Sequence, residues 1–272
     1  MMPQSKTKTS KKENYLSIHI HVNGLSFFTH DHLGKVAAIC REQFSNPVRP
    51  ETLHDALYKA LKRESLLDSS FTEVRCSVEN NLATIVPKKL FETASLNEYV
   101  HKDIDLKKDD FIAHDIQPDT DWVNVYVPYV NINNMLLENF GSFSYYHAVS
   151  IWLNALIKHT KADGKTVWGL YKEGETLHIA LFRDKNLQYY ASFVATKPKD
   201  VAYYVLLTAQ ELNINPEEAP LFITGNMAIE DAAYKALYPF IRSLNFLQAE
   251  NNLKFDDPQL QQHQDFCLLN LY

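Results

Sequence analysis

Apolar and polar residues alternate along two neighbouring stretches near the start of the chain, as they do in half-buried β-strands. The stretches are residues 16–22 and 25–30, and Asn23-Gly24 lies between them. Gly tolerates the positive φ of a primed two-residue turn, so the pattern predicts a hairpin. Pairing outward from this turn sets His30 opposite Ser17 and separates an apolar face from a second face, which carries Ser17, His19, His21, Ser26, Phe28 and His30.

The same order of elements returns in the second half of the chain. Residues 167–171 and 176–182 flank Glu173-Gly174, and this turn follows the first by 150 residues. Each hairpin is followed by a third predicted strand, a helix with a 3.6-residue apolar period and one more strand. The two helices start about 147 residues apart, so the offset is nearly constant. The pattern therefore predicts two lobes of one topology, formed by duplication.

Four segments are expected along the chain. Residues 1–14 are rich in Lys, Ser and Thr and are predicted to be a disordered tail. An N-terminal lobe is expected over residues 15–141 and a C-terminal lobe over 142–248. Residues 249–272 end in an apolar run that would aggregate if exposed, so we expect a tail that packs back on the body. Both the groove between the lobes and a distant sheet edge could receive it.

Composition narrows the class of protein. Of the 272 residues, 46% are hydrophobic and 22% are charged, which is typical of a globular chain long enough for two cores. A net charge of -6 offers no basic surface for nucleic acid. No apolar run approaches the roughly 20 residues that span a bilayer, and the N-terminus has no signal-peptide pattern. Cys40, Cys76 and Cys267 form no CxxC motif, so we expect reduced thiols in a cytoplasmic protein.

The chain resembles an uncharacterised bacterial protein family in five stretches: LSIHIHVNGLSFF, NNLATIVPKKLF, WVNVYVPYVNINNMLLENFGSF, WGLYKEGETLHIALFRDKNLQYYASF and PLFITGN. Members of that family look like the superfamily of actin, sugar kinases and heat-shock-chaperone ATPases, with analogues among the cytoplasmic assembly proteins of type IV pili and type II secretion. The resemblance covers about residues 15–247. It implies an α/β fold with mixed sheets, a ribonuclease-H-like duplication in which each lobe has the order βββαβαβα, and a cleft in which active members hold ATP and magnesium.

Active members of that superfamily carry Asp-x-Gly at the first hairpin of each lobe, where the acid places magnesium and the glycine lets amides reach phosphate. Neither hairpin of this chain has the motif, and a paired glycine on the adenosine side is reduced to one. The chain has seven glycines, where average usage would supply about 19. The resemblance therefore implies a remnant cofactor site in which ATP and magnesium are disfavoured. Its residues would be Asn23, Gly24, Glu173, Gly174, Gly225 and Asn226.

The face that carries His19, His21 and His30 is a second candidate for chemistry. Imidazoles on paired strands, with Cβ atoms about 7 Å apart, are near metal-ligand range. No carboxylate or cysteine joins them at a matching position of the hairpin. We therefore interpret the face as a half-solvated polar surface and predict no metal site.

Two functions remain compatible with the sequence. The favoured one is a non-catalytic interaction or scaffold protein with protein partners, because phosphoryl transfer depends on charges that the two hairpins lack. The alternative is an ATP-binding protein or ATP-dependent enzyme with divergent phosphate loops. No Ser-His-Asp, Cys-His or P-loop spacing assigns a catalytic residue.

Overall fold

The first lobe is built on a five-stranded sheet with the order β3-β2-β1-β4-β8. The computed structural model describes residues 14–100, 110–160, 166–255 and 260–271, so the predicted disordered tail, except for Asn14, lies outside the described residues. Strands β1 to β3 are antiparallel, and β4 and β8 run parallel to β1. The strands are β1 (Asn14–His21), β2 (Gly24–Asp31), β3 (Val36–Gln43), β4 (Glu73–Val78) and β8 (Ser144–His147).

Two helices cover the outer face of this sheet. They are α1 (Leu53–Arg63), which follows the short 3-10 turn Pro50–Thr52, and α3 (Val130–Phe140). The apolar stripe of α1 packs on the alternate apolar residues of β1 and β2, as the periodicity requires. The fully buried members of this core include Ile18, Ile20, Leu53, Leu57, Leu61, Ile132 and Leu136.

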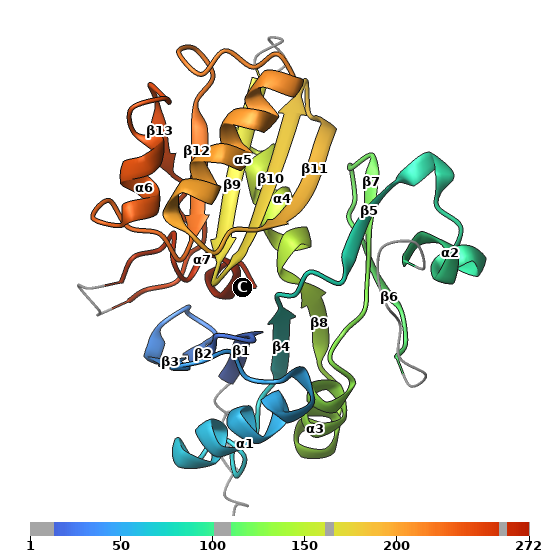
Figure 1. Ribbon diagram of the computed structural model, residues 1–272. Coiled ribbons are helices and arrows are strands. Elements are labelled where there is room, and N and C mark those ends of the chain that lie inside the picture. Colours follow the sequence, from blue (N-terminus) through green and yellow to red (C-terminus); the bar gives the residue numbers. More distant parts are fainter. Residues whose placement is uncertain (1–13, 101–109, 161–165, 256–259, 272) are drawn as a thin grey trace, which may run out of the picture.

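The second lobe repeats this plan. Its sheet has the order β11-β10-β9-β12-β13, with the same directions as in the first lobe. The strands are β9 (Thr166–Glu173), β10 (Thr176–Arg183), β11 (Asn186–Val194), β12 (Leu221–Gly225) and β13 (Leu244–Phe246). Helices α5 (Pro198–Glu211) and α6 (Ala232–Leu237) cover its outer face (Figure 1). The predicted α/β fold of two lobes with one topology is confirmed.

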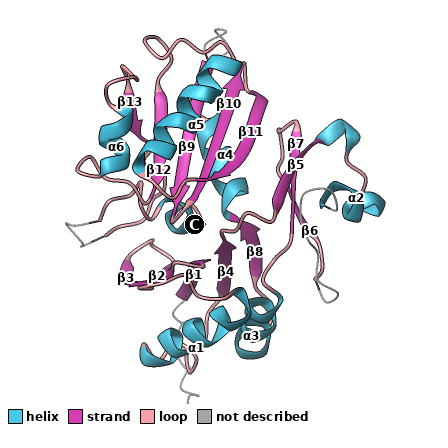
Figure 2. Cartoon of the chain, viewed as in Figure 1, coloured by secondary structure: helices cyan, strands magenta, loops and turns pink. Residues whose placement is uncertain are grey.

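A small third sheet is inserted between β4 and α3. Its order is β5-β7-β6, all antiparallel, and it stands to one side of both lobes (Figure 2). Every residue of β7 is buried, and its one polar side chain, Asn124, donates a hydrogen bond to the Ser150 hydroxyl at 2.9 Å. The elements are β5 (Ala83–Pro87), the 3-10 turns Lys88–Leu90 and Thr93–Ser95, α2 (Leu96–Val100), β6 (Ala113–Ile116) and β7 (Trp122–Tyr126).

Two helices form the layer between the lobes. Helix α4 (Ala148–Ile157) follows β8 and packs on the inner face of the second sheet, where Gly169 lies against Trp152 and Leu156. Helix α7 (Phe266–Leu269) lies in the same layer, between the two lobes (Figure 1). By element order, α7 holds in the second lobe the place that α4 holds in the first.

The segment before α7 crosses to the first lobe. Lys254 pairs with Lys35 in an isolated parallel bridge, and the backbone N–H of Lys254 donates to the carbonyl of Gly34. The chain then returns to the space between the sheets. The sequence predicted a second lobe over residues 142–248, but β8 (Ser144–His147) pairs with β4 and so belongs to the first sheet. The crossover between the lobes is helix α4.

Both hairpin turns lie one position away from the predicted ones. His21 pairs with Gly24, so the first loop is Val22-Asn23, and Glu173 pairs with Thr176, so the second is Gly174-Glu175. Gly24 belongs to β2, where an added Cβ would stand 2.6 Å from the Glu42 carbonyl oxygen. A close backbone approach, and not a positive φ, therefore requires this glycine.

The shift in register moves His30 but keeps the two faces of the hairpin. His30 lies opposite Tyr15, with the two rings stacked at 4.8 Å, whereas the prediction set it opposite Ser17. The pairing moves by two residues, and side chains alternate with a period of two, so His19 and His21 stay on the predicted face.

Along the described ranges, no helix is both long and apolar enough to cross a bilayer.

Candidate functional site

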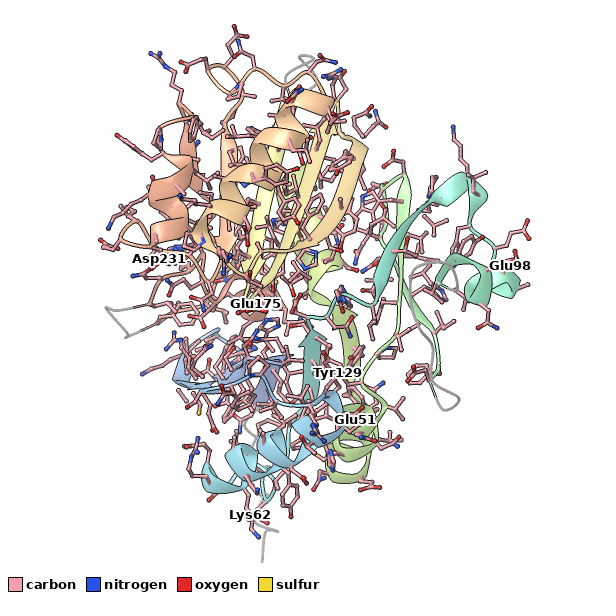
Figure 3. All side chains as sticks on the ribbon, viewed as in Figure 1. Glu51, Lys62, Glu98, Tyr129, Glu175 and Asp231 are labelled. Carbon is pink, nitrogen blue, oxygen red and sulfur yellow. The ribbon has the colours of Figure 1, made fainter. Side chains whose placement is uncertain are left out.

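The tips of the two hairpins touch where the lobes meet. A Cβ added to Gly174 would come within 1.7 Å of the Asn23 amide nitrogen, so the Asn23 side chain lies directly against Gly174. The carbonyl of Gly174 also accepts a hydrogen bond from the Lys172 ammonium group. Glu175, in the same turn, lies at the end of the second lobe that faces the first (Figure 3). The two loops that would have to surround a phosphate are in contact with each other.

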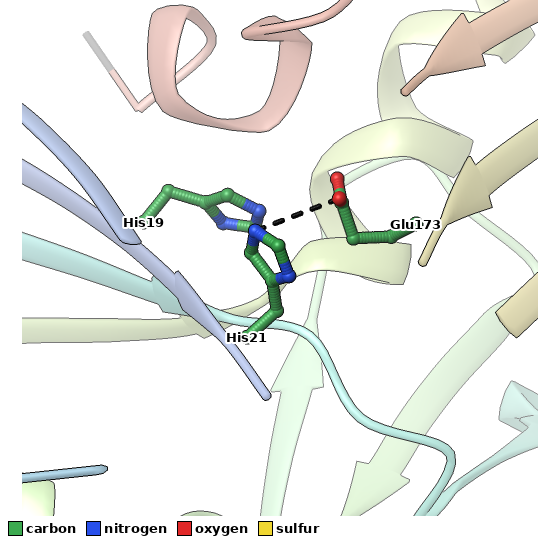
Figure 4. Close-up of side chains that lie close together, drawn as sticks. All are labelled: His19, His21 and Glu173. Atoms are coloured by element: carbon green, nitrogen blue, oxygen red, sulfur yellow. Dashed lines mark ion pairs between the residues drawn. The ribbon is translucent and has the colours of Figure 1, made fainter. Parts of the chain in front are cut away.

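Two imidazoles of β1 and a carboxylate of β9 meet beside these tips (Figure 4). His21 Nε2 lies 3.5 Å from Glu173 Oε1, and His19 Nδ1 lies 2.8 Å from the Ser77 hydroxyl. His19, His21 and Glu173 are all buried, and each offers one ligand atom to a group whose members lie within 4.8 Å of one another. We call these three residues the interlobe cluster. His21 Nδ1 is buried and has no hydrogen-bond partner among the described residues.

Burial shifts the pKa of every member of the interlobe cluster toward its uncharged form. Desolvation, with smaller contributions from His21 and His147, lowers the pKa of His19 to about 3. Desolvation alone lowers the pKa of His21 to about 4. Desolvation first, and then the Glu79 carboxylate, raise the pKa of Glu173 to about 8. At neutral pH the 3.5 Å contact between His21 and Glu173 therefore joins two uncharged groups.

A cavity of about 270 Å³ opens beside the interlobe cluster. Both lobes and the C-terminal segment line it. Among the described residues that form its wall, Arg41 is the one cationic side chain, whereas Glu42, Glu173 and Asp265 bring carboxyl groups. Arg41 is itself bound by Asp265 through Nε and Nη2, at 3.0 and 2.8 Å. The wall of the cavity is therefore poor in the positive charge that a polyphosphate requires.

A second buried polar contact joins the lobes deeper in the interface. His178 of β10 lies with Nε2 3.1 Å from Glu79 Oε1 and with Nδ1 3.0 Å from the Tyr190 hydroxyl. Glu79 follows β4 of the first lobe and is 1% exposed, and His178 is fully buried. Buried polar groups of this kind are costly unless paired, so the two lobes depend on each other for their hydrogen bonds.

Gly225 and Asn226 follow β12 and lie next to the second hairpin. The backbone N–H of Asn226 donates to the Lys172 carbonyl at 2.7 Å, and the N–H of Gly225 donates to the His263 carbonyl at 2.7 Å. Gly225 has a φ of +82°, and a Cβ there would stand 2.1 Å from the same Lys172 oxygen. Strand packing alone therefore demands glycine at this position, whether or not a ligand is bound.

Gly225→Ala should lower the free energy of unfolding by about 2–4 kcal/mol, because it combines a positive φ with a collision against backbone. Gly141→Ala is the matched control. Gly141 has a φ of +76°, but nothing lies within 4 Å of its added Cβ, so this variant isolates the backbone strain, about 1 kcal/mol. Urea unfolding of both variants measures the difference, and equal losses would show that the Lys172 carbonyl does not matter.

The structure brings most of the predicted site residues together between the lobes, and it adds residues that were not predicted. Asn23 contacts Gly174, and Glu173 and Asn226 share the wall of one cavity. Gly24 is placed by its contact with β3, and His30 lies apart, stacked on Tyr15. The interpretation of this face as half-solvated is wrong, because His19, His21 and His30 are only 6%, 7% and 4% exposed. The first hairpin itself offers the imidazoles no carboxylate at a matching position. Glu173 reaches them from a hairpin 150 residues away.

A family model matches residues 3–244 of the chain, nearly its whole length. The chain belongs to the DUF3822 family. Members are described as proteins of unknown function. No protein in the curated collection matches the chain significantly.

Solved structures similar to this DUF3822 protein have the actin-like fold. A Bacteroides thetaiotaomicron protein, described as having an actin-like ATPase fold and unknown function, aligns with a TM-score of 0.77 and 17% identity, over 89% of this chain and 94% of that one. A PilM-PilN type IV pilus biogenesis complex gives a TM-score of 0.60 and 13% identity, over 94% and 97% of the two chains. The ethanolamine utilization protein EutJ of Carboxydothermus hydrogenoformans gives 0.50 and 7%, over 94% and 88%. At these identities the likeness establishes the fold.

Proposed function

We propose that this DUF3822 protein is a non-catalytic, protein-binding member of the actin-like fold that works in the cytoplasm. The observation that carries the proposal is the contact between the two hairpin tips, Asn23 against Gly174. A phosphate bound by both loops would have to separate them. Neither tip has an Asp-x-Gly motif, so no bound magnesium ion would offset the free-energy cost of that separation.

The charges around the cleft support the same reading. Catalysis of phosphoryl transfer relies on cations placed around the transferred group. Here Arg41, the one cationic side chain among the described residues of the wall, is already bound to Asp265, so it is not available to a phosphate. A cytoplasmic location is supported by the cysteines, because Cys40, Cys76 and Cys267 are all free thiols.

For the partner, the proposal is an extended segment of another protein chain. Strands β5 and β11 are both edges of their sheets, and a cavity of about 390 Å³ lies between residues of the two, including Ala83, Thr84, Ser192 and Val194. Unpaired strand edges recruit extended peptides through backbone hydrogen bonds. Val194 is 57% exposed at this place. The PilM-PilN structure, described as a pilus biogenesis complex, supports a protein partner for this fold.

A nucleotide titration tests the non-catalytic part. ATP and ADP, each with and without magnesium, should leave the melting temperature unchanged, because the touching hairpin tips leave no place for the phosphates. A nucleotide that did bind, at 100 times its Kd, would add about 2.7 kcal/mol of stability, and the melting temperature would rise. A saturable rise in melting temperature with ATP, lost in Glu173→Gln, would instead establish the alternative of an ATP-binding protein with divergent loops.

A crosslinking experiment tests the partner surface. A photo-reactive amino acid in place of Val194 should give a crosslink to one defined protein in cells. The same group in place of Leu137 on α3 should not, although both side chains are 57% exposed. Equal crosslinking at the two positions would show ordinary surface encounters and would contradict a partner at the β5 and β11 edges.

A further inference from the structure

Three ligand atoms face one another between the lobes at the interlobe cluster. His19 and His21 project from one face of β1, and Glu173 arrives from β9 of the other lobe (Figure 4). The ring nitrogen Nδ1 of His21 has no hydrogen-bond partner among the described residues, and the His21 residue is 7% exposed. The other ring nitrogen, Nε2, faces Glu173 Oε1 at 3.5 Å and is the His21 atom that points into the interlobe cluster.

We propose that His19, His21 and Glu173 bind one divalent transition-metal ion of the zinc class, which holds the two lobes together. Two imidazole nitrogens and one carboxylate oxygen are the protein ligands of many zinc sites that keep a fourth position open. The carboxyl group of Glu173 releases its proton to solvent when the ion binds. The adjoining cavity of about 270 Å³ leaves room for a water or small ligand at that fourth position. The site goes beyond the proposed function, since it needs no nucleotide and no partner.

The geometry is close to what such a site requires. Bonds of 2.0–2.1 Å in a tetrahedron put ligand atoms about 3.3 Å apart. His21 Nε2 and Glu173 Oε1 are already 3.5 Å apart, and the whole group lies within 4.8 Å. Shifts of about 1 Å or less in the side chains would complete the coordination.

A second shell orients one ligand. His19 Nδ1 lies 2.8 Å from the Ser77 hydroxyl, and Ser77 is fully buried on β4. When Nδ1 carries the proton and donates to Ser77, the lone pair of His19 is on Nε2, which is the form that binds metal. Such outer hydrogen bonds fix the tautomer and the ring orientation of ligating histidines.

The ligand types select the metal. Imidazole nitrogen suits zinc, nickel, cobalt and copper, whereas magnesium prefers an all-oxygen shell. Asp265 and Glu42, which line the same cavity, are each paired with an arginine, Arg41 and Arg63, so the selection rests on the ligand atoms themselves. The structure therefore predicts that zinc binds and that magnesium does not compete at similar concentration.

The test uses the full-length protein, freed of any affinity tag and treated with a chelator. Titration with zinc chloride should give one equivalent per chain and a higher melting temperature. Glu173→Gln and His21→Gln should each weaken zinc binding about tenfold or more, since each removes a direct ligand. His30→Gln is the matched control, because it changes a buried histidine of the same hairpin outside the interlobe cluster, and it should bind zinc like the wild type.

Two further measurements make the result specific. X-ray absorption at the zinc edge should show two imidazole ligands in the wild type and fewer in His21→Gln. Zinc should also slow amide exchange at both tips, residues 22–24 and 173–175, because one ion links both lobes. The two ligand variants lie in different lobes, so one decides the matter if the other does not fold. Absence of equimolar zinc binding, equal affinity in Glu173→Gln, or preference for magnesium would each overturn the proposal.

Discussion

Deleting residues 265–272 should lower the free energy of unfolding by about 6 kcal/mol or more, enough to leave little folded protein at 37 °C. The deletion removes Phe266, Leu268, Leu269 and Leu271, none of which is more than 4% exposed. Each such side chain contributes about 1.5–3 kcal/mol by leaving water. A whole domain is stable by only about 5–15 kcal/mol, so the short last helix accounts for a large share.

The position of α7 explains why the effect should be so large. Leu268 and Leu269 pack with Phe28 of the first sheet and Ile151 of α4, whereas Phe266 packs with the cluster on the inner face of the second sheet. Asp265 receives two hydrogen bonds from Arg41 Nε and Nη2. Truncation would therefore expose the inner faces of both sheets at once.

Chemical unfolding followed by circular dichroism measures this effect. Leu269→Ala should cost about 2–5 kcal/mol, as for other fully buried leucines, and provides a folded variant if the deletion does not express. Leu137→Ala, at a side chain 57% exposed on α3, should change stability by less than about 0.5 kcal/mol. A deletion protein with wild-type stability would show that α7 is dispensable.

The duplicated sheets could be predicted from the chain because their signals are local. Alternation of apolar residues, a glycine near each turn and helical stripes at 53–61 and 201–212 need no knowledge of distant contacts. The exact registers could not be predicted, because Gly24 is required by the approach of the Glu42 carbonyl from β3, while Gly174 is required by its φ of +56°. A sequence does not distinguish these two reasons for a glycine.

The interlobe cluster was out of reach for a different reason. His19 and His21 could be placed on one strand face from their spacing, but the partner of that face was unknown. In the sequence, Glu173 precedes the glycine of a predicted turn, and nothing at that position indicates a contact with the imidazoles. Only the packing of one lobe on the other brings its carboxyl group within 3.5 Å of His21. Contacts between separately folded lobes leave no periodic trace in either segment.

Between pH 7 and pH 5, His147→Asn should lose about 2 kcal/mol less stability than the wild-type protein. His147 is fully buried and caps α4, with Nδ1 accepting a hydrogen bond from the Val149 N–H at 3.2 Å. Desolvation first, and then the neighbouring His178, lower the pKa of His147 from 6.5 to about 3. The folded protein therefore holds this imidazole neutral at a pH where the unfolded chain protonates it.

The direction follows from proton linkage. Below pH 6.5 the His147 side chain is protonated in the unfolded state, whereas in the folded state it stays neutral down to about pH 3. The contribution of the neutral imidazole to stability is therefore fully present above pH 6.5 and decreases as the pH falls from 6.5 to about 3. Asp115 faces His147, and its side chain accepts a hydrogen bond from the His147 backbone N–H at 2.9 Å. The Tyr126 ring, Asn80, His178 and His19 also face it. Burial raises the pKa of Asp115, against hydrogen bonds from Ser150, the His147 N–H and Tyr126 that lower it.

Asparagine suits the test because it is among the best N-cap residues and does not titrate. Unfolding free energies of the wild type and His147→Asn, measured from pH 7 to pH 5, give the difference in slope, and every other titrating group cancels between the two proteins. His32→Asn, at an exposed position, serves as the control for replacing a histidine by asparagine. Parallel pH profiles for the wild type and His147→Asn would mean that His147 takes up its proton without unfolding, and that the cap of α4 opens to water in the folded state.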